Sequence, residues 1–94
     1  MESKSGNKTL TLCVIAPDGR ETKVECDSVK LSAIDGEKKR GGGYLGIRKG
    51  HIDAIVSLDN KPICAYLDGD IVYKQNNSGG VAVIKSNSVT VFQL

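Results

Sequence analysis

A strand, a two-residue turn and a second strand can be read directly from Val81-Ala82-Val83-Ile84-Lys85-Ser86-Asn87-Ser88-Val89-Thr90-Val91-Phe92. Both flanking runs are rich in β-branched side chains, which fit a pleated sheet and lose rotamer freedom in a helix. Ser86 and Asn87 are residue types that turns favour. The stretch therefore predicts a β-hairpin at the C-terminal end of the chain.

Strand-like runs separated by turn residues continue toward the N-terminus at roughly ten-residue spacing. The run at residues 9–15 alternates with period two and places Leu10, Leu12 and Val14 on one face. No window shows a convincing helical period with caps. The other predicted strands cover residues 21–26, 29–33, 44–47, 52–58, 63–67 and 71–74. The sequence therefore predicts an all-β fold, an antiparallel two-sheet β-sandwich or flattened barrel of about ten short strands.

Two local details add to this prediction. Asp68-Gly69 is a good signal for a two-residue hairpin turn. Between Cys26 and Val29 the apolar phase moves by one residue, at Asp27-Ser28. A one-residue slip within a continuous strand pattern is typical of a β-bulge, so a bulge is predicted there.

Length and composition bound the organisation of the chain. The protein has 94 residues, of which 39% are hydrophobic and 26% charged, and its net charge is +2. These values predict one small globular domain and argue against binding nucleic acid through bulk charge. We expect residues 1–7 to form a disordered tail and residues 8–94 to form the β-sandwich domain. No apolar run approaches the ~18 residues of a membrane-spanning helix.

The three cysteines do not form a recognisable chemical motif. Cys13, Cys26 and Cys64 are odd in number and widely spaced, with no Cys-x-x-Cys pair, so neither a zinc site nor a dithiol motif is signalled. Each lies within an apolar, strand-like stretch. We expect reduced thiols in the core of the domain.

The loop between the third and fourth predicted strands is rich in glycine and basic residues. Gly41-Gly42-Gly43-Tyr44-Leu45-Gly46 formally matches Gly-x-Gly-x-x-Gly, but no helix follows to hold a phosphate, so a loop is favoured over a nucleotide site. The run Lys38-Lys39-Arg40 could contact an acidic or phosphate-bearing surface. His51, the only histidine, has no evident metal or catalytic partners. We therefore predict no cofactor, no metal and no catalytic residue.

The order of these pieces resembles the N-terminal β-sandwich of the F-type ATP synthase epsilon subunit. The segments that carry the resemblance are residues 8–19, Val29-Lys30-Leu31, Gly43-Tyr44-Leu45-Gly46-Ile47-Arg48-Lys49-Gly50-His51, Ser78-Gly79-Gly80-Val81-Ala82-Val83 and Asn87-Ser88-Val89-Thr90-Val91. The resemblance covers nearly the whole chain after the tail.

The sequence also departs from this family. Tyr44 stands where the family has Glu, and Lys49 stands where it has Pro. The loop before Gly43 is longer by several residues, and the excess includes Lys38-Lys39-Arg40. The chain stops at Leu94, so we expect it to lack the pair of C-terminal helices that in many members restrains ATP hydrolysis.

The resemblance implies a non-catalytic rotor subunit of the central stalk. Such subunits bind the gamma subunit and rest on the membrane-embedded ring of c subunits, which here implies a peripheral protein on the cytoplasmic side of a bacterial inner or plasma membrane. It also implies a set of partner-binding residues, with the loop facing the c ring and the segment around Gly80 facing gamma. These residues are Lys38, Lys39, Arg40, Tyr44, His51, Ile52, Gly79, Gly80 and Val81.

Two other interpretations remain open from the sequence. The first is a free-standing β-sandwich binding module that holds an anionic ligand with the basic glycine-rich loop. That module would bind in a strongly salt-dependent manner, because exposed charges are screened by salt. The second is a small enzyme, which would require His51 for turnover.

Overall fold

The computed structural model describes residues 9–34, 44–50 and 53–94. Within these ranges the chain forms nine strands. Their bounds are β1 (Leu10–Ile15), β2 (Glu21–Cys26), β3 (Ser28–Ser32), β4 (Tyr44–Arg48), β5 (Ala54–Leu58), β6 (Ile63–Leu67), β7 (Asp70–Gln75), β8 (Gly80–Lys85) and β9 (Ser88–Gln93).

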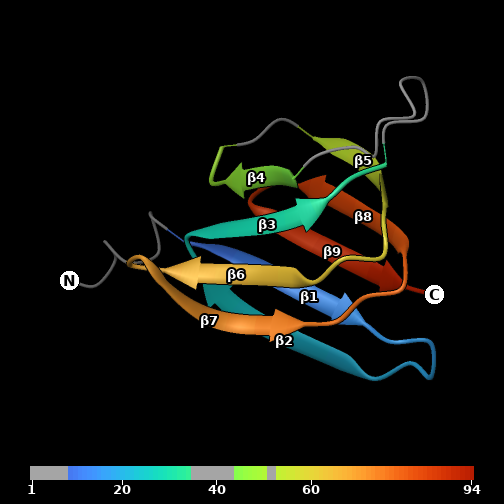
Figure 1. Ribbon diagram of the computed structural model, residues 1–94. Helices are drawn as coiled ribbons and strands as arrows, with labels where there is room; N and C mark the ends of the chain where they lie inside the picture. Colours follow the sequence, from blue (N-terminus) through green and yellow to red (C-terminus); the bar gives the residue numbers. More distant parts are fainter. Residues whose placement is uncertain (1–8, 35–43, 51–52) are drawn as a thin grey trace.

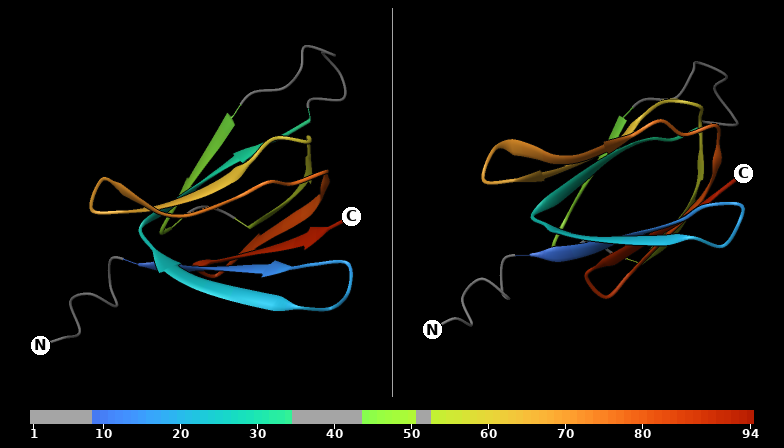
Figure 2. Two further views of the ribbon diagram at one scale, coloured as in Figure 1. Left: turned by 60° about the horizontal axis from the view of Figure 1, so that its bottom comes forward. Right: turned by 90° about the horizontal axis from the view of Figure 1, so that it is seen from below.

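The strands build two layers. A five-stranded sheet has the order β2-β1-β9-β8-β5, and a four-stranded sheet has the order β4-β3-β6-β7 (Figures 1 and 2). The predicted all-β sandwich is therefore confirmed, as two open sheets rather than a closed barrel. Among the described strands one pair, β1 and β9, is parallel, and the others are antiparallel. A parallel pair needs a long connection, and here almost the whole sandwich lies between its two strands.

Apolar side chains from both sheets fill the space between the layers. Leu10, Leu12 and Val14 all point inward and are buried, as the alternation predicts. Aliphatic residues and Cys26 make up this cluster, so its stability comes from burying many medium-sized side chains. The other buried members are Val29, Leu31, Ile47, Leu58, Ile63, Ala65, Ala82, Ile84, Val89 and Val91.

The bulge predicted at Asp27-Ser28 is wrong, because the chain changes sheet there. Cys26 ends β2 in the five-stranded sheet, Ser28 begins β3 in the four-stranded sheet, and Asp27 forms the bend between them. The Asp27 amide donates to the Tyr66 carbonyl at 2.8 Å. Crossing from one layer to the other reverses which side of the strand faces the core, and this reversal produces the same one-residue slip in the apolar pattern.

The predicted hairpin turns are confirmed. Asp68 and Gly69 both have positive φ, and Ser86 and Asn87 have φ of 48° and 64°. Two consecutive left-handed residues are the geometry that matches strand twist in a tight hairpin. A register shift does occur nearby, between β6 and β7 at Ala65/Tyr66.

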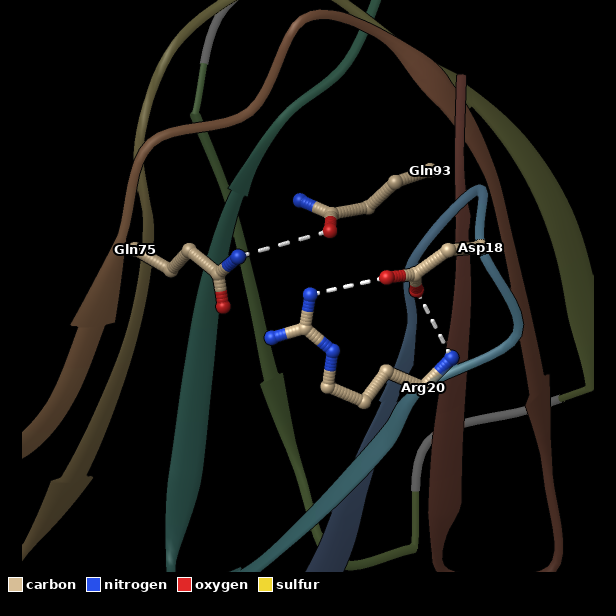
Figure 3. Close-up of polar contacts among 4 residues, drawn as sticks. All are labelled: Asp18, Arg20, Gln75 and Gln93. Carbon is tan, nitrogen blue, oxygen red and sulfur yellow. Dashed lines mark hydrogen bonds and ion pairs between the residues drawn. The ribbon is translucent and has the colours of Figure 1, made fainter.

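Polar side chains close one end of the sandwich. Gln75 on β7 and Gln93 on β9 point toward each other across the two layers, and Arg20 turns back onto Asp18 in the β1–β2 turn (Figure 3). Gln93 also donates to the Asn77 side chain at 3.2 Å, and the buried Asn77 amide reaches a backbone carbonyl. The described residues contain no buried side-chain polar atom without a partner. This network ties the two sheets together where the apolar core ends.

The buried thiol of Cys26 should make the fold sensitive to alkaline pH. Burial, helped by the negative charges of Asp27 and Glu25, raises the pKa of Cys26 from 9.0 to about 11. Between these values the unfolded chain has lost the proton that the folded chain keeps, so stability falls as pH rises. We expect a loss of about 2–3 kcal/mol from pH 8 to pH 11, measured by urea unfolding. In Cys26→Ala this part of the alkaline slope should disappear, and an unchanged slope would contradict the assignment.

Candidate protein-binding face

The outer side of the five-stranded sheet carries apolar residues on four of its strands. Along β8 and β9, Ala82, Ile84, Val89 and Val91 face the core, so Val81, Val83 and Phe92 face outward. In the ladder Val81 lies opposite Phe92, and Val83 lies opposite Ile55 of β5. Ile15 of β1 lies beside Phe92 on its other side. We call these five residues the outer apolar face: Ile15, Ile55, Val81, Val83 and Phe92.

Three members of the outer apolar face are strongly exposed. Ile55 is 74% exposed, Phe92 46% and Val81 37%. Cross-strand neighbours in a sheet have Cβ atoms about 5 Å apart, so the five side chains form one contiguous patch and are not scattered. A contiguous apolar patch on a small protein commonly marks a surface that another protein covers.

The side of this patch that borders β2 is polar. On β2 the side chains of Glu21, Lys23 and Glu25 alternate in charge. The Cys13 thiol donates to the Glu21 carboxylate at 3.1 Å, and Thr11 donates to Glu25 at 3.0 Å. Burial, and next the hydrogen bond that the thiol donates to Glu21, raises the pKa of the Cys13 thiol. A neutral thiol beside an apolar patch with a charged border fits the usual anatomy of a protein interface.

The structure places the last three predicted partner-binding residues at the start of β8. Val81 belongs to the outer apolar face, as just described. Gly79 is buried and Gly80 is half-buried, so neither offers much surface to a partner. Both have positive φ and lie where the chain passes from β7 to β8 and so changes sheet. Their geometry gives them a structural reason to be glycine, whatever they contact.

The other predicted partner-binding residues cannot be placed in the same way. Lys38, Lys39 and Arg40, and also His51 and Ile52, lie outside the described residues. Tyr44 begins β4 and pairs with Ser32 in the four-stranded sheet. The alternative of an anionic ligand held by the basic loop therefore stays a prediction.

Sequence reasoning missed most of the outer apolar face, although a signal was present. Residues 54–56 and 81–84 are continuous apolar runs rather than alternating ones. In a strand with one solvent-exposed face, apolar and polar residues alternate. A strand that is covered on both faces has an unbroken apolar run instead. These two runs pair with each other as β5 and β8. Unbroken apolar runs on two paired strands are therefore the signal in the sequence that could have indicated an apolar outer face on this sheet.

Neither a metal-binding cluster nor a membrane-spanning helix is found in the described residues. No group of three or more His, Cys, Asp or Glu side chains in these ranges is arranged to hold a metal ion. None of the elements described there is a helix long and apolar enough to cross a membrane.

Comparison with protein-family models gives no match, and comparison with curated proteins gives none either. A chain of an ATP synthase shares the fold. It belongs to the cryo-electron microscopy structure of the central stalk and c ring of the mitochondrial ATP synthase of Tetrahymena thermophila. The TM-score is 0.64 at 10% sequence identity, and the match covers 89% of the present chain and 62% of the other. The present chain thus spans less than two thirds of that protein, and the likeness is one of fold.

Proposed function

We propose that this chain is an epsilon-type adaptor subunit in the central stalk of a rotary ATP synthase. Three observations support the proposal together. The fold is shared with a chain of a central stalk and c-ring structure, the order of sequence motifs resembles the epsilon family, and one sheet presents an exposed apolar face. The observation that carries the proposal is the outer apolar face, because it supplies a surface that the resemblance requires and that a free monomer would not need.

In this proposal the outer apolar face packs against the gamma subunit, and the segment at residues 35–43, which matches the c-ring-contacting region of the family that the sequence resembles, contacts the c ring. The protein makes and breaks no covalent bond. It transmits torque, for which a two-layered sheet with a close-packed interior is well suited because packed interiors have low compressibility. The subunit would be peripheral to the membrane through its complex. The cytoplasmic, bacterial location stays a prediction.

Co-purification with the gamma subunit from the same source tests the proposal. The tagged chain and untagged gamma subunit are co-expressed, and the tagged chain is recovered at low and at moderate salt. We expect a stoichiometric complex that survives moderate salt, because an apolar contact is not screened by ions. Recovery of the chain as a free monomer under both conditions would exclude the stalk assignment and leave only the fold.

A further inference from the structure

The outer side of the four-stranded sheet has a different chemistry from the outer apolar face. Val29 and Ile47 point into the core. The residues next to them along β3 and β4, Ser28 and Arg48, therefore point outward and lie opposite each other. By the same alternation Lys30 lies opposite Cys64, and Cys64 lies opposite Lys74 on β7. The three basic residues are exposed and sit on three different strands. None of these outward ladder positions on the described strands carries a carboxylate.

An apolar and aromatic cluster lies next to these basic residues, toward the β6–β7 turn. Tyr66 of β6 points outward between Ser28 on one side and Ile71 on the other. Ile71 is 53% exposed, and its neighbour Val72 is 46% exposed at the register shift. A centre containing Tyr and aliphatic side chains with Arg at its edge is the composition found at protein–protein contacts.

The distribution of charge narrows the choice of partner. Arg48 and Lys74 lie on strands three spacings apart and in ladder rows two residues apart, which places their Cα atoms about 16 Å from each other. Lys30 lies between them in the ladder and takes part in an interaction of its own. A second copy of this chain docked with its own basic residues on this part of the face would bring like charges against one another.

A membrane surface fits less well than a protein. Asp68 and Asp70 lie beside Ile71 at the β6–β7 turn, and the Asp27 carboxylate accepts a hydrogen bond from the Asp68 amide there. If the face lay flat on a bilayer, anionic lipid headgroups would repel these carboxylates. A folded protein can place its own charges so that carboxylates meet only the basic part of the face.

We infer that the outer side of the four-stranded sheet binds an acidic segment of a second protein subunit, with carboxylates near Arg48 and Lys74 and apolar contacts on Tyr66, Ile71 and Val72. The inference rests on the proposed function in one respect, since it takes that subunit to belong to the same assembly. It assigns to the chain two docking faces on opposite layers, one apolar and one basic, in addition to the c-ring contact proposed above.

Two chemical measurements on the assembly purified through the tagged chain test this inference. A carbodiimide joins a lysine amine to a carboxylate only where the two are in direct contact. We expect a covalent link from Lys74 to an Asp or Glu of a subunit other than gamma, identified by peptide mass spectrometry. Cys64 lies on the same face and is the least buried of the three thiols. We expect N-ethylmaleimide to modify it roughly tenfold more slowly in the assembly than in the isolated chain, because access limits thiol reactivity.

Charge-reversal variants complete the test. Arg48→Glu with Lys74→Glu should keep gamma on the chain but reduce recovery of the linked subunit by about tenfold. Lys61→Glu, the same kind of charge reversal in the exposed β5–β6 turn and outside both faces, should reduce recovery of neither. If gamma is absent from the assembly, the proposed function fails. If gamma is present and Cys64 reacts at the rate of the isolated chain, the second face is empty and the inference is wrong. Protection of Cys64 without any link from Lys74 would also overturn it, because the covering surface would not be acidic.

Discussion

Replacing Gly80 with alanine is expected to destabilise the domain by at least about 3 kcal/mol, a large part of the 5–15 kcal/mol that holds a typical small domain together. Gly80 has φ of +132°, a conformation that residues with a side chain rarely adopt. A Cβ atom there would fall well inside contact distance of the Phe92 carbonyl oxygen and 3.1 Å from its carbon. Both are backbone atoms of the β8–β9 ladder, so the substitution can be accommodated only by separating the two strands.

Two matched variants isolate the cause. Gly46 lies inside β4, and a Cβ there would meet nothing within 4 Å, so Gly46→Ala should leave stability within about 1 kcal/mol of wild type. Gly19 has φ of +92° but also has open space around it, so Gly19→Ala reports backbone strain alone. Urea unfolding of the three variants measures the difference. A Gly80→Ala protein as stable as Gly46→Ala would show that the β7–β8 connection can be rearranged.

Ile55→Lys is expected to weaken the proposed association with the gamma subunit by at least about 100-fold while leaving the isolated domain folded. The side chain is 74% exposed, so its replacement should change the free energy of unfolding by no more than about 0.5 kcal/mol. Once the outer apolar face is covered, however, an ammonium group at this position would be buried without a partner. Burying an unpaired charge costs far more than losing one apolar contact.

The control uses the same chemical change on the other layer. Ile71 is also aliphatic and exposed, and it lies in the four-stranded sheet. Ile71→Lys should keep the affinity for gamma, measured by titrating labelled chain into purified gamma subunit. Equal weakening by both substitutions would indicate a general effect of charge rather than a defined face. No weakening by Ile55→Lys would place the gamma contact elsewhere on the domain.

Local chemistry predicts much of this fold, but it does not predict which strands become neighbours. Alternation along residues 9–15 identified the inward positions Leu10, Leu12 and Val14, and turn residues located the hairpins at Asp68-Gly69 and Ser86-Asn87. The crossing at Asp27 was misinterpreted, because a bulge and a change of sheet leave the same trace in a one-dimensional pattern. The distinction depends on partners far away in the sequence, such as Tyr66, whose carbonyl fixes the bend.

The candidate site was only partly predictable for a similar reason. Val81 was identified from its place in a motif order, whereas Ile55 and Phe92 gain their meaning by lying next to it across β5, β8 and β9. A surface patch is a property of three strands at once, and register decides its members. Arg48 and Lys74 are likewise isolated basic residues in the sequence. Only the strand order β4-β3-β6-β7 places them on the same sheet.

The position of β9 has a consequence for how the protein is made. This last strand lies in the interior of its sheet, with β1 on one side and β8 on the other. While the ribosome is still translating the residues before Ser88, β1 and β8 each expose an open backbone edge that only β9 can fill. Completion of the sandwich must therefore wait for residues 88–93 to emerge from the ribosome. Until then, the open edges of β1 and β8 can pair with strands of other chains, which favours domain swapping and aggregation.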